Sequence, residues 1–202
     1  MKHIIKSSYL LPIIALLFIG WGGSWKEIQQ TTGTITSVQA EFVQEKHLPI
    51  LATPLVSKGM FYYQGPRSLR WEYQHPVRSI LLMHDGRVRQ FVAGASGFKE
   101  QGNAGLQGMQ VVLEEITDWL MGRFDTNPMF DAQLADKGRI VLKPKEAAFN
   151  AVIEQIVIQL SETPGIIKSV TIYESPTAFT QMTFNHTILN QPIDDAVFQD
   201  VP

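Results

Sequence analysis

Apolar and polar side chains alternate mostly with a period of two between residues 39 and 92, which is the pattern of strands with one buried face. Turn-forming pairs interrupt the alternation at Thr53-Pro54, Gly65-Pro66, His75-Pro76 and Asp85-Gly86. Asp85-Gly86 suits the positive φ angles of a type I′ hairpin. The segment is therefore predicted to be a meander of short antiparallel strands.

The alternation is cleanest in residues 68–73. One face of this strand would carry Leu69, Trp71 and Tyr73, and the other would carry Ser68, Arg70 and Glu72. We expect the apolar face to be buried. We expect the polar face, including Arg70 with Glu72 as its neighbour, to lie in solvent.

A helix is predicted over residues 109–121. Apolar residues recur there at helical spacing, with Met109, Leu113, Ile116 and Leu120 on one side, and Gly122 ends the pattern. Five glycines between residues 94 and 108 precede the helix and are interpreted as a mobile loop able to act as a hinge. The helix is amphipathic and lies in the middle of the sheet order, so we expect it to act as a lid.

A second meander follows the helix, and turn residues separate its segments. A helix between Trp25 and Ser37 is predicted from its position alone, and residues 145–150 suit one helical turn. The whole pattern predicts an α+β chain with one antiparallel sheet. The candidate strands of the second meander are 129–135, 138–143, 153–161, 166–174 and 178–189.

The first 23 residues have the basic, apolar and small-residue order of a secretory signal. Lys2 and Lys6 precede an apolar run over residues 9–19, which is about half of the ~20 residues that a bilayer-spanning helix needs. We expect residues 1–23 to be a signal peptide and residues 24–202 to be one folded domain. The alternative is an uncleaved anchor that continues through Trp21 and Trp25.

The amino-acid composition excludes several kinds of functional site. The chain is 45% apolar and 18% charged, which fits a folded domain. It has no cysteine, which excludes disulfides, thiolate nucleophiles, thiolate metal sites and a lipidated cysteine anchor. Export without cysteine favours a bacterial periplasm.

Charge argues against a nucleic-acid partner. The net charge of −2 becomes −4 once Lys2 and Lys6 are removed with the signal peptide. A phosphate-binding surface needs concentrated basic residues. The chain offers only the short pairs Arg67/Arg70 and Arg87/Arg89, so we expect no nucleic-acid binding.

Signatures of catalysis are missing from the sequence. It has no G-x-S-x-G elbow, no H-E-x-x-H motif and no dinucleotide fingerprint. His75, His84 and Asp85 would be metal ligands if a hairpin brought them together, but turns commonly select these residue types. We therefore expect neither an enzyme nor a metal or other cofactor.

Large, soft side chains are frequent for a half-open sheet. Taken singly, most of them fit a core between sheet and helix. As a set, they also fit a site for an irregular apolar ligand, because methionine and aromatic side chains adapt to such ligands. The set is Met60, Phe61, Tyr62, Tyr63, Trp71, Tyr73, Met83, Phe91, Phe98, Met109, Trp119, Met121 and Phe124.

Several motifs occur in the order that is typical of one known protein family. Segment 38–46 (VQAEFVQEK) is similar to the family's A-x-F-x-Q strand, and Ser57-Lys-Gly59 to its glycine-containing strand. Segment 65–73 (GPRSLRWEY) is similar to P-x-x-[LF]-R-W, and is followed by Pro76 and the Asp85-Gly86 hairpin. Residues 119–124 resemble the family's helix end, and residues 190–198 (NQPIDDAVF) resemble its closing N-x-P-[IL]-D-D-x-x-F motif. By these motifs the chain resembles the LolA family of periplasmic outer-membrane lipoprotein carriers.

The resemblance implies a curved antiparallel half-barrel whose concave face is covered by helices over a hydrophobic cavity. It also implies a carrier that takes acylated lipoproteins from an inner-membrane ABC transporter, shields their acyl chains, and delivers them to an outer-membrane receptor lipoprotein. The residues that we expect to line the cavity are Phe61, Leu69, Trp71, Tyr73, Met109, Leu113, Ile116 and Leu120.

The chain departs from the family at Gly65, where an arginine that latches the lid would be expected. Arg67 has the same strand parity as Leu69 and Trp71, so it is our candidate for a replacement latch at the cavity rim. The alternative is an ordinary solvated turn residue, because Pro66 breaks strand alternation.

Other functions fit the same resemblance. A carrier of this fold would also suit a lipid other than a lipoprotein, and a lipid-sensing regulatory module of the same fold is a further candidate. A periplasmic hydrolase ranks last, since no nucleophile and base stand in matched motifs.

Overall fold

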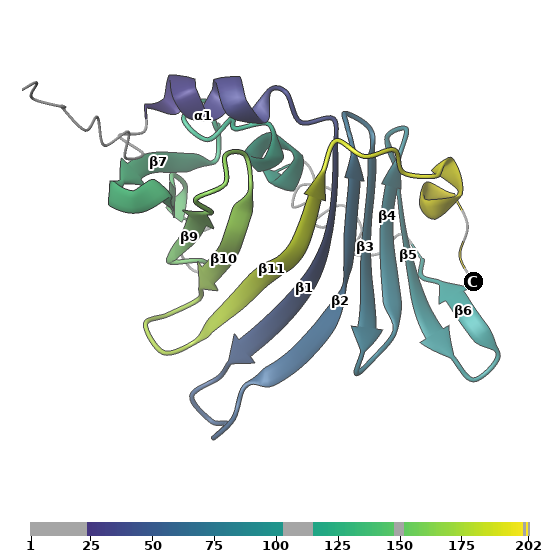
Figure 1. Cartoon of the computed structure of the whole chain (residues 1–202). Coiled ribbons are helices and arrows are strands. Elements are labelled where there is room, and N and C mark those ends of the chain that lie inside the picture. Colours follow the sequence, from purple (N-terminus) through teal and green to yellow (C-terminus); the bar gives the residue numbers. More distant parts are fainter. Residues whose placement is uncertain (1–23, 103–114, 148–151, 200, 202) are drawn as a thin grey trace, which may run out of the picture.

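The computed structural model describes residues 24–102, 115–147, 152–199 and 201. These residues form one sheet with short helices around it (Figure 1). The elements are α1 (Trp25–Thr32), β1 (Ser37–His47), β2 (Leu55–Gln64), β3 (Ser68–His75), β4 (Ser79–His84), β5 (Arg87–Gly94), β6 (Gly97–Glu100), a helix over residues 115–120, β7 (Phe130–Ala135), η1 (Asp136–Gly138), β8 (Arg139–Pro144), β9 (Gln155–Leu160), β10 (Ile167–Tyr173), β11 (Phe179–Leu189) and η2 (Asp195–Phe198).

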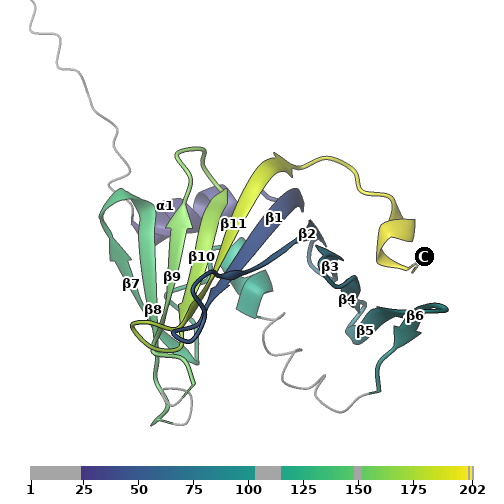
Figure 2. The ribbon, with the colours of Figure 1, turned by 90° about the horizontal axis from the view of Figure 1, so that it is seen from below.

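The sheet is antiparallel throughout, with the strand order β6-β5-β4-β3-β2-β1-β11-β10-β9-β8-β7. Each meander is built from consecutive strands, and the two meanders meet where β1 pairs with β11, from Val38 opposite Leu189 to His47 opposite Phe179. Seen from below, the sheet curves around the helix at 115–120 (Figure 2). The predicted curved, open antiparallel sheet is confirmed.

Helix α1 begins at a capping box. The Ser24 hydroxyl accepts a hydrogen bond from the Glu27 amide, and the Glu27 carboxylate accepts one from the Ser24 amide. Ile28 on its inner side is buried in the core. The predicted helix therefore exists, and it ends at Thr32, before Gly33.

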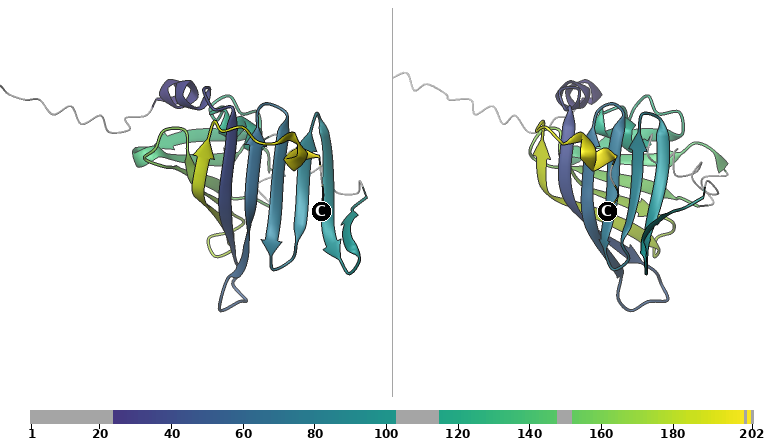
Figure 3. Two further views of the ribbon diagram at one scale, coloured as in Figure 1. Left: turned by 45° about the vertical axis from the view of Figure 1, so that its right-hand side comes forward. Right: turned by 90° about the vertical axis from the view of Figure 1, so that its right-hand side faces the viewer.

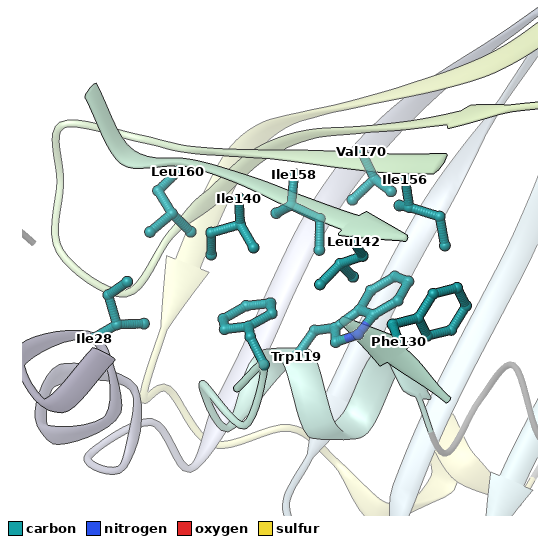
Figure 4. Packing of buried hydrophobic residues seen from close by; sticks show 10 residues of the cluster. Ile28, Trp119, Phe130, Ile140, Leu142, Ile156, Ile158, Leu160 and Val170 are labelled. Atoms are coloured by element: carbon teal, nitrogen blue, oxygen red, sulfur yellow. The ribbon is translucent and has the colours of Figure 1, made fainter. Parts of the chain in front are cut away.

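The main core lies between the helices and strands β7–β10. Figure 4 shows Trp119 from helix 115–120 and Ile28 from α1 pointing toward Ile140, Leu142 and Ile158 of the sheet. All of these side chains are buried. Both helices are therefore held to the concave face by apolar packing.

Most of the predicted strands agree with the structure to within one or two residues, and Asp85 and Gly86 have the positive φ angles of the predicted turn. The glycine-rich stretch is a correction. Gly94 to Gly97 make a tight turn, and Gly97–Glu100 form strand β6 on β5, so this part is not a loose loop. Residues 103–114 and 148–151, with parts of the predicted lid helix and of the helical turn at 145–150, lie outside the described residues.

Arg70 is a second correction, because it is 6% exposed instead of facing solvent. Its guanidinium contacts the Glu72 carboxylate at 2.7 Å and donates to the Val197 carbonyl at 3.0 Å. The neighbour was predicted correctly and the exposure was not. Figure 3 shows the reason, since the chain after β11 runs across the outer face of the sheet to η2, which contacts β3 and β4.

The predicted turn residues at His84 and Asp85 do not form a metal site with His75. His84 lies opposite Ser68 at one end of the β3–β4 pair, and His75 ends β3 at the other. No group of three potential metal-ligating side chains exists in the described part of the chain. Within the same residues, no helix is long and apolar enough to cross a membrane.

Candidate apolar binding cavity

A cavity of about 290 Å³ lies between the concave face of the sheet and helix 115–120. Its lining comes from strands β1–β5, from strands β10 and β11 with the turn before β10, and from the helix. The surfaces are mostly aliphatic and aromatic, so the cavity offers few hydrogen-bond partners to a ligand.

The first wall is an aromatic cluster on β2 and β3. The ring centroids of Phe61 and Trp71 lie 5.2 Å apart in an edge arrangement. Phe42 supports this wall from β1, 5.3 Å from Trp71 and 5.1 Å from Tyr73. Edge contacts of this kind favour fixed ring orientations, so the wall has a defined shape.

The second wall is formed by Val170, Ile172, Met182 and Phe184 on β10 and β11. Phe184 reaches toward the first wall, with its ring centroid 6.0 Å from that of Phe61. Sequence analysis did not select these residues. Alternation along strand 178–189 would have placed Met182 and Phe184 on one face, but only the pairing of β11 with β1 puts that face opposite Trp71.

Most of the polar lining residues lie at one end of the cavity, whereas Gln90 and Thr187 lie elsewhere along it. The Tyr73 hydroxyl donates to Gln44 Oε1 at 2.8 Å, and Lys46 and Glu174 form an ion pair at 3.2 Å nearby. Burial, partly offset by the Trp71 indole, raises the pKa of the Tyr73 phenol to about 12. The phenol is therefore neutral at physiological pH and keeps the proton that it donates to Gln44.

Helix 115–120 closes the cavity with Ile116, Trp119 and Leu120. Its first described turn is tied to the sheet, because the buried Glu115 carboxylate accepts a hydrogen bond of 2.5 Å from the Asn127 amide. The Asn127 side-chain oxygen in turn accepts from the Phe130 amide, the first residue of β7. Gly122 ends the helix with a φ of +71°, as predicted.

Five of the predicted cavity residues line the cavity: Phe61, Trp71, Tyr73, Ile116 and Leu120. Leu69 has the predicted parity but is fully buried in the adjoining core. Met109 and Leu113 lie outside the described residues.

Arg67 lies in the turn between β2 and β3 and is exposed. Its guanidinium pairs with Asp85 at 3.5 Å. Arg67 and Asp85 border the same surface depression as Thr117 and Asp118 of helix 115–120. Arg67 thus lies beside helix 115–120, and its guanidinium already forms an ion pair with Asp85.

Solved structures with a similar fold include MucB in two settings. MucB alone matches with a TM-score of 0.51 at 14% identity over 86% of this chain and 60% of that chain. The MucA/MucB complex of Pseudomonas aeruginosa matches with a TM-score of 0.50 at 12% identity, over 86% of this chain and 59% of that chain. This chain therefore spans about three fifths of the MucB chains that it matches, and the likeness concerns the fold.

A LolA superfamily protein from Nitrosomonas europaea also matches, with a TM-score of 0.42 at 9% identity over 86% of this chain and 94% of that chain. No curated protein matches this sequence. The family described as outer membrane lipoprotein carrier protein LolA matches residues 33–200, which include the sheet and both walls of the cavity. By this match, the chain belongs to the LolA family.

Proposed function

We propose that this protein is a periplasmic carrier that shields the acyl chains of lipoproteins, or of another acylated lipid, in the cavity beneath helix 115–120. The observation that carries the proposal is a LolA-family chain with an apolar cavity, most of whose polar lining residues lie at one end. Such a site suits a ligand with an apolar tail and a polar head.

The energetics of burial suffice for this task without a chemical step. A cavity of 290 Å³ has room for about ten groups of the size of a water molecule, at ~30 Å³ each. If methylenes fill that space, removing them from water contributes about 0.8 kcal/mol each, or about 8 kcal/mol in total. We therefore propose a binding protein rather than an enzyme.

The direction of transport and the partners are part of the proposal. The export pattern in residues 1–23 supports a periplasmic location. Family membership supports loading by an inner-membrane ABC transporter and delivery to an outer-membrane receptor lipoprotein. Neither the transporter nor the receptor is needed for binding itself, so binding is tested first.

The test combines cargo identification with a matched pair of variants. Native mass spectrometry and lipid extraction of protein purified from its own periplasm should reveal an acylated molecule. Met182→Arg places a charge in the cavity and should abolish binding of a fatty acid, measured as loss of the ligand-induced rise in melting temperature. Thr183→Arg, one residue along and on the other face of β11, should retain binding.

Equal binding by wild type and Met182→Arg would remove the cavity from the proposal. Transfer of the bound lipid between donor and acceptor vesicles then separates a carrier from a sensing module. A protein that binds acylated lipid but never releases it to acceptors would fit the sensing module instead.

A further inference from the structure

Exposed aliphatic side chains are concentrated at one end of the sheet. Because the strands are antiparallel, the loops β1–β2, β3–β4, β5–β6, β8–β9 and β10–β11 share one end, here called the lower rim. Among the described residues, all the strongly exposed large aliphatic side chains except Ile188 belong to this rim: Ile50, Leu51, Leu55, Val56, Val77 and Val152.

The tip of the β1–β2 hairpin is the most prominent part of the lower rim. Figures 1 and 3 show it extending beyond the neighbouring hairpins. Residues 48–57 contain no charged side chain, and Ile50 at the tip is 89% exposed. Exposed apolar groups that no core explains indicate an interaction site.

The tip is also shaped for shallow insertion into an apolar medium. The Leu51 amide donates to the Leu48 carbonyl at 2.9 Å, so this backbone donor already has a partner. Pro49 and Pro54 have no amide donor to satisfy. Unpaired backbone donors would oppose entry into lipid, and Pro49, Leu51 and Pro54 add none.

The charged residues beside the hairpin tip favour a lipid surface over a protein partner at the lower rim. Lys46 and Lys58 flank the uncharged tip, and exposed Lys58 forms no ion pair among the described residues. Cationic side chains beside an apolar insertion favour anionic headgroups. The other loops of the lower rim carry charged residues, among them Arg78, Lys145 and Glu174, and so do the turns at the opposite end, so within the rim the hairpin tip is distinguished by its lack of charge.

The polar end of the cavity lies at the same rim. Ser79 begins β4, Glu174 directly follows β10, and Thr180 is the second residue of β11. A bilayer held against the lower rim would therefore face the end of the cavity where a lipid headgroup would sit.

We propose that the lower rim is a contact surface for the lipid bilayer, with Ile50 and Leu51 of the hairpin tip inserted among the acyl chains. This goes beyond the proposed carrier function, because it concerns the outside of the molecule and does not depend on what fills the cavity. It assigns the protein an orientation on a membrane in which the cavity end and the hairpin tip face the same surface.

Because the chain has no cysteine, a single introduced cysteine reports on one position alone. Ile50→Cys and Ile188→Cys are each labelled with an environment-sensitive fluorophore and mixed with cargo-free vesicles of phosphatidylethanolamine and phosphatidylglycerol. Ile188 is the matched control, since it is 50% exposed and lies near the opposite end of β11. We expect a blue shift at position 50 and none at position 188.

Binding is then quantified by vesicle flotation. The double variant Ile50→Ser with Leu51→Ser should lose roughly tenfold or more in partition coefficient, because two aliphatic anchors are removed. Ile188→Ser should bind as wild type does. Lys58→Glu should weaken binding to vesicles with phosphatidylglycerol and leave binding to phosphatidylcholine vesicles unchanged.

The proposal would be overturned if the fluorescence at position 50 does not shift, or if it shifts equally at positions 50 and 188. This holds even if the chain binds the vesicles through its apolar residues 9–19, because binding by that segment would not place position 50 in lipid. Fatty-acid binding is measured on the same labelled proteins without vesicles. Intact fatty-acid binding with a silent probe refutes the membrane contact alone, whereas a shifted probe without fatty-acid binding refutes the carrier alone.

Discussion

At the residue scale, Gly59 shows how one missing side chain shapes the cavity wall. A Cβ at this position would lie 1.8 Å from the Glu72 carbonyl oxygen and 2.9 Å from the Phe42 ring. The register of β2 and β3 also shifts between Lys58 and Gly59. Glycine here lets two strands and an aromatic ring meet at one point, directly behind the Trp71 wall.

Gly59→Ala should therefore destabilise the protein by about 1 to 3 kcal/mol, the usual cost of overpacking a fixed site. Urea unfolding followed by circular dichroism measures the change. Gly102→Ala is the control, because a Cβ there meets nothing within 4 Å, and it should stay within about 0.5 kcal/mol of wild type. If the two variants have the same free energy of unfolding, the close approach at Gly59 does not contribute to stability.

Arg70 shows what alternation along a strand leaves open. Its side chain has the predicted parity, opposite to Trp71, but parity names a face and not what covers that face. Here Ile80, Leu82 and Phe91 form a small second core on the outer face, and Val201 packs against it. The covering segment follows β11, more than a hundred positions from Arg70, so no local pattern near Arg70 indicates it.

At the scale of elements, the strands could be predicted because each has its own turn residues and its own alternation. The two walls of the cavity could be predicted only in part. Residues of the β3 wall stand out by size in one short motif, whereas Met182 and Phe184 acquire their role from the pairing of β11 with β1. Long-range pairing of this kind leaves no periodicity in the sequence.

Helix 115–120 covers one side of the cavity, so the prediction that it acts as a lid implies that it moves when a ligand enters. Its contacts include apolar packing by Trp119 on the inner side and the Glu115–Asn127 hydrogen bond at one end. Arg67 lies beside its other described residues Thr117 and Asp118. A latch at Arg67 therefore remains a prediction about the opening of this helix.

Arg67→Leu should change the rate of acyl-ligand release several-fold, which corresponds to about 1 to 2 kcal/mol for a charge-assisted hydrogen bond. Release is followed by stopped-flow transfer of a fluorescent fatty acid to acceptor vesicles. Arg70 is unsuitable as a control since it is buried. Arg87 is exposed at the start of β5 and replaces it, and Arg87→Leu should release ligand at the wild-type rate. Identical rates for wild type and Arg67→Leu would make Arg67 an ordinary turn residue.

At the scale of the whole molecule, the sheet is two local meanders joined at one seam. Neighbouring strands within each meander are close in the sequence, but Val38 and Leu189 at the seam are separated by most of the described chain. Closing such a long loop costs more entropy than closing a hairpin, and non-local pairing forms slowly.

We therefore expect the seam to form late in refolding. Pulsed hydrogen exchange with mass spectrometry should show amides of β3 and β4 protected before those of β1 and β11. Asp85→Ala weakens a hairpin turn inside one meander, where φ is +47°, and should slow the early protection, whereas Phe184→Ala should slow the late one. Simultaneous protection of all four strands would show that the seam is not a separate step.

The seam has a consequence for how the cell handles this protein. Strands β1 and β11, the first and last strands in the sequence, are neighbours in the sheet and lie on opposite sides of the seam, so a chain that stops before β11 lacks part of the second wall of the cavity. Such a fragment would be left with β1 as an unpaired edge and an uncovered aromatic surface, which are features that promote aggregation. We therefore expect truncated chains to be removed by proteolysis, so that only chains that include β11 reach the form with a complete cavity.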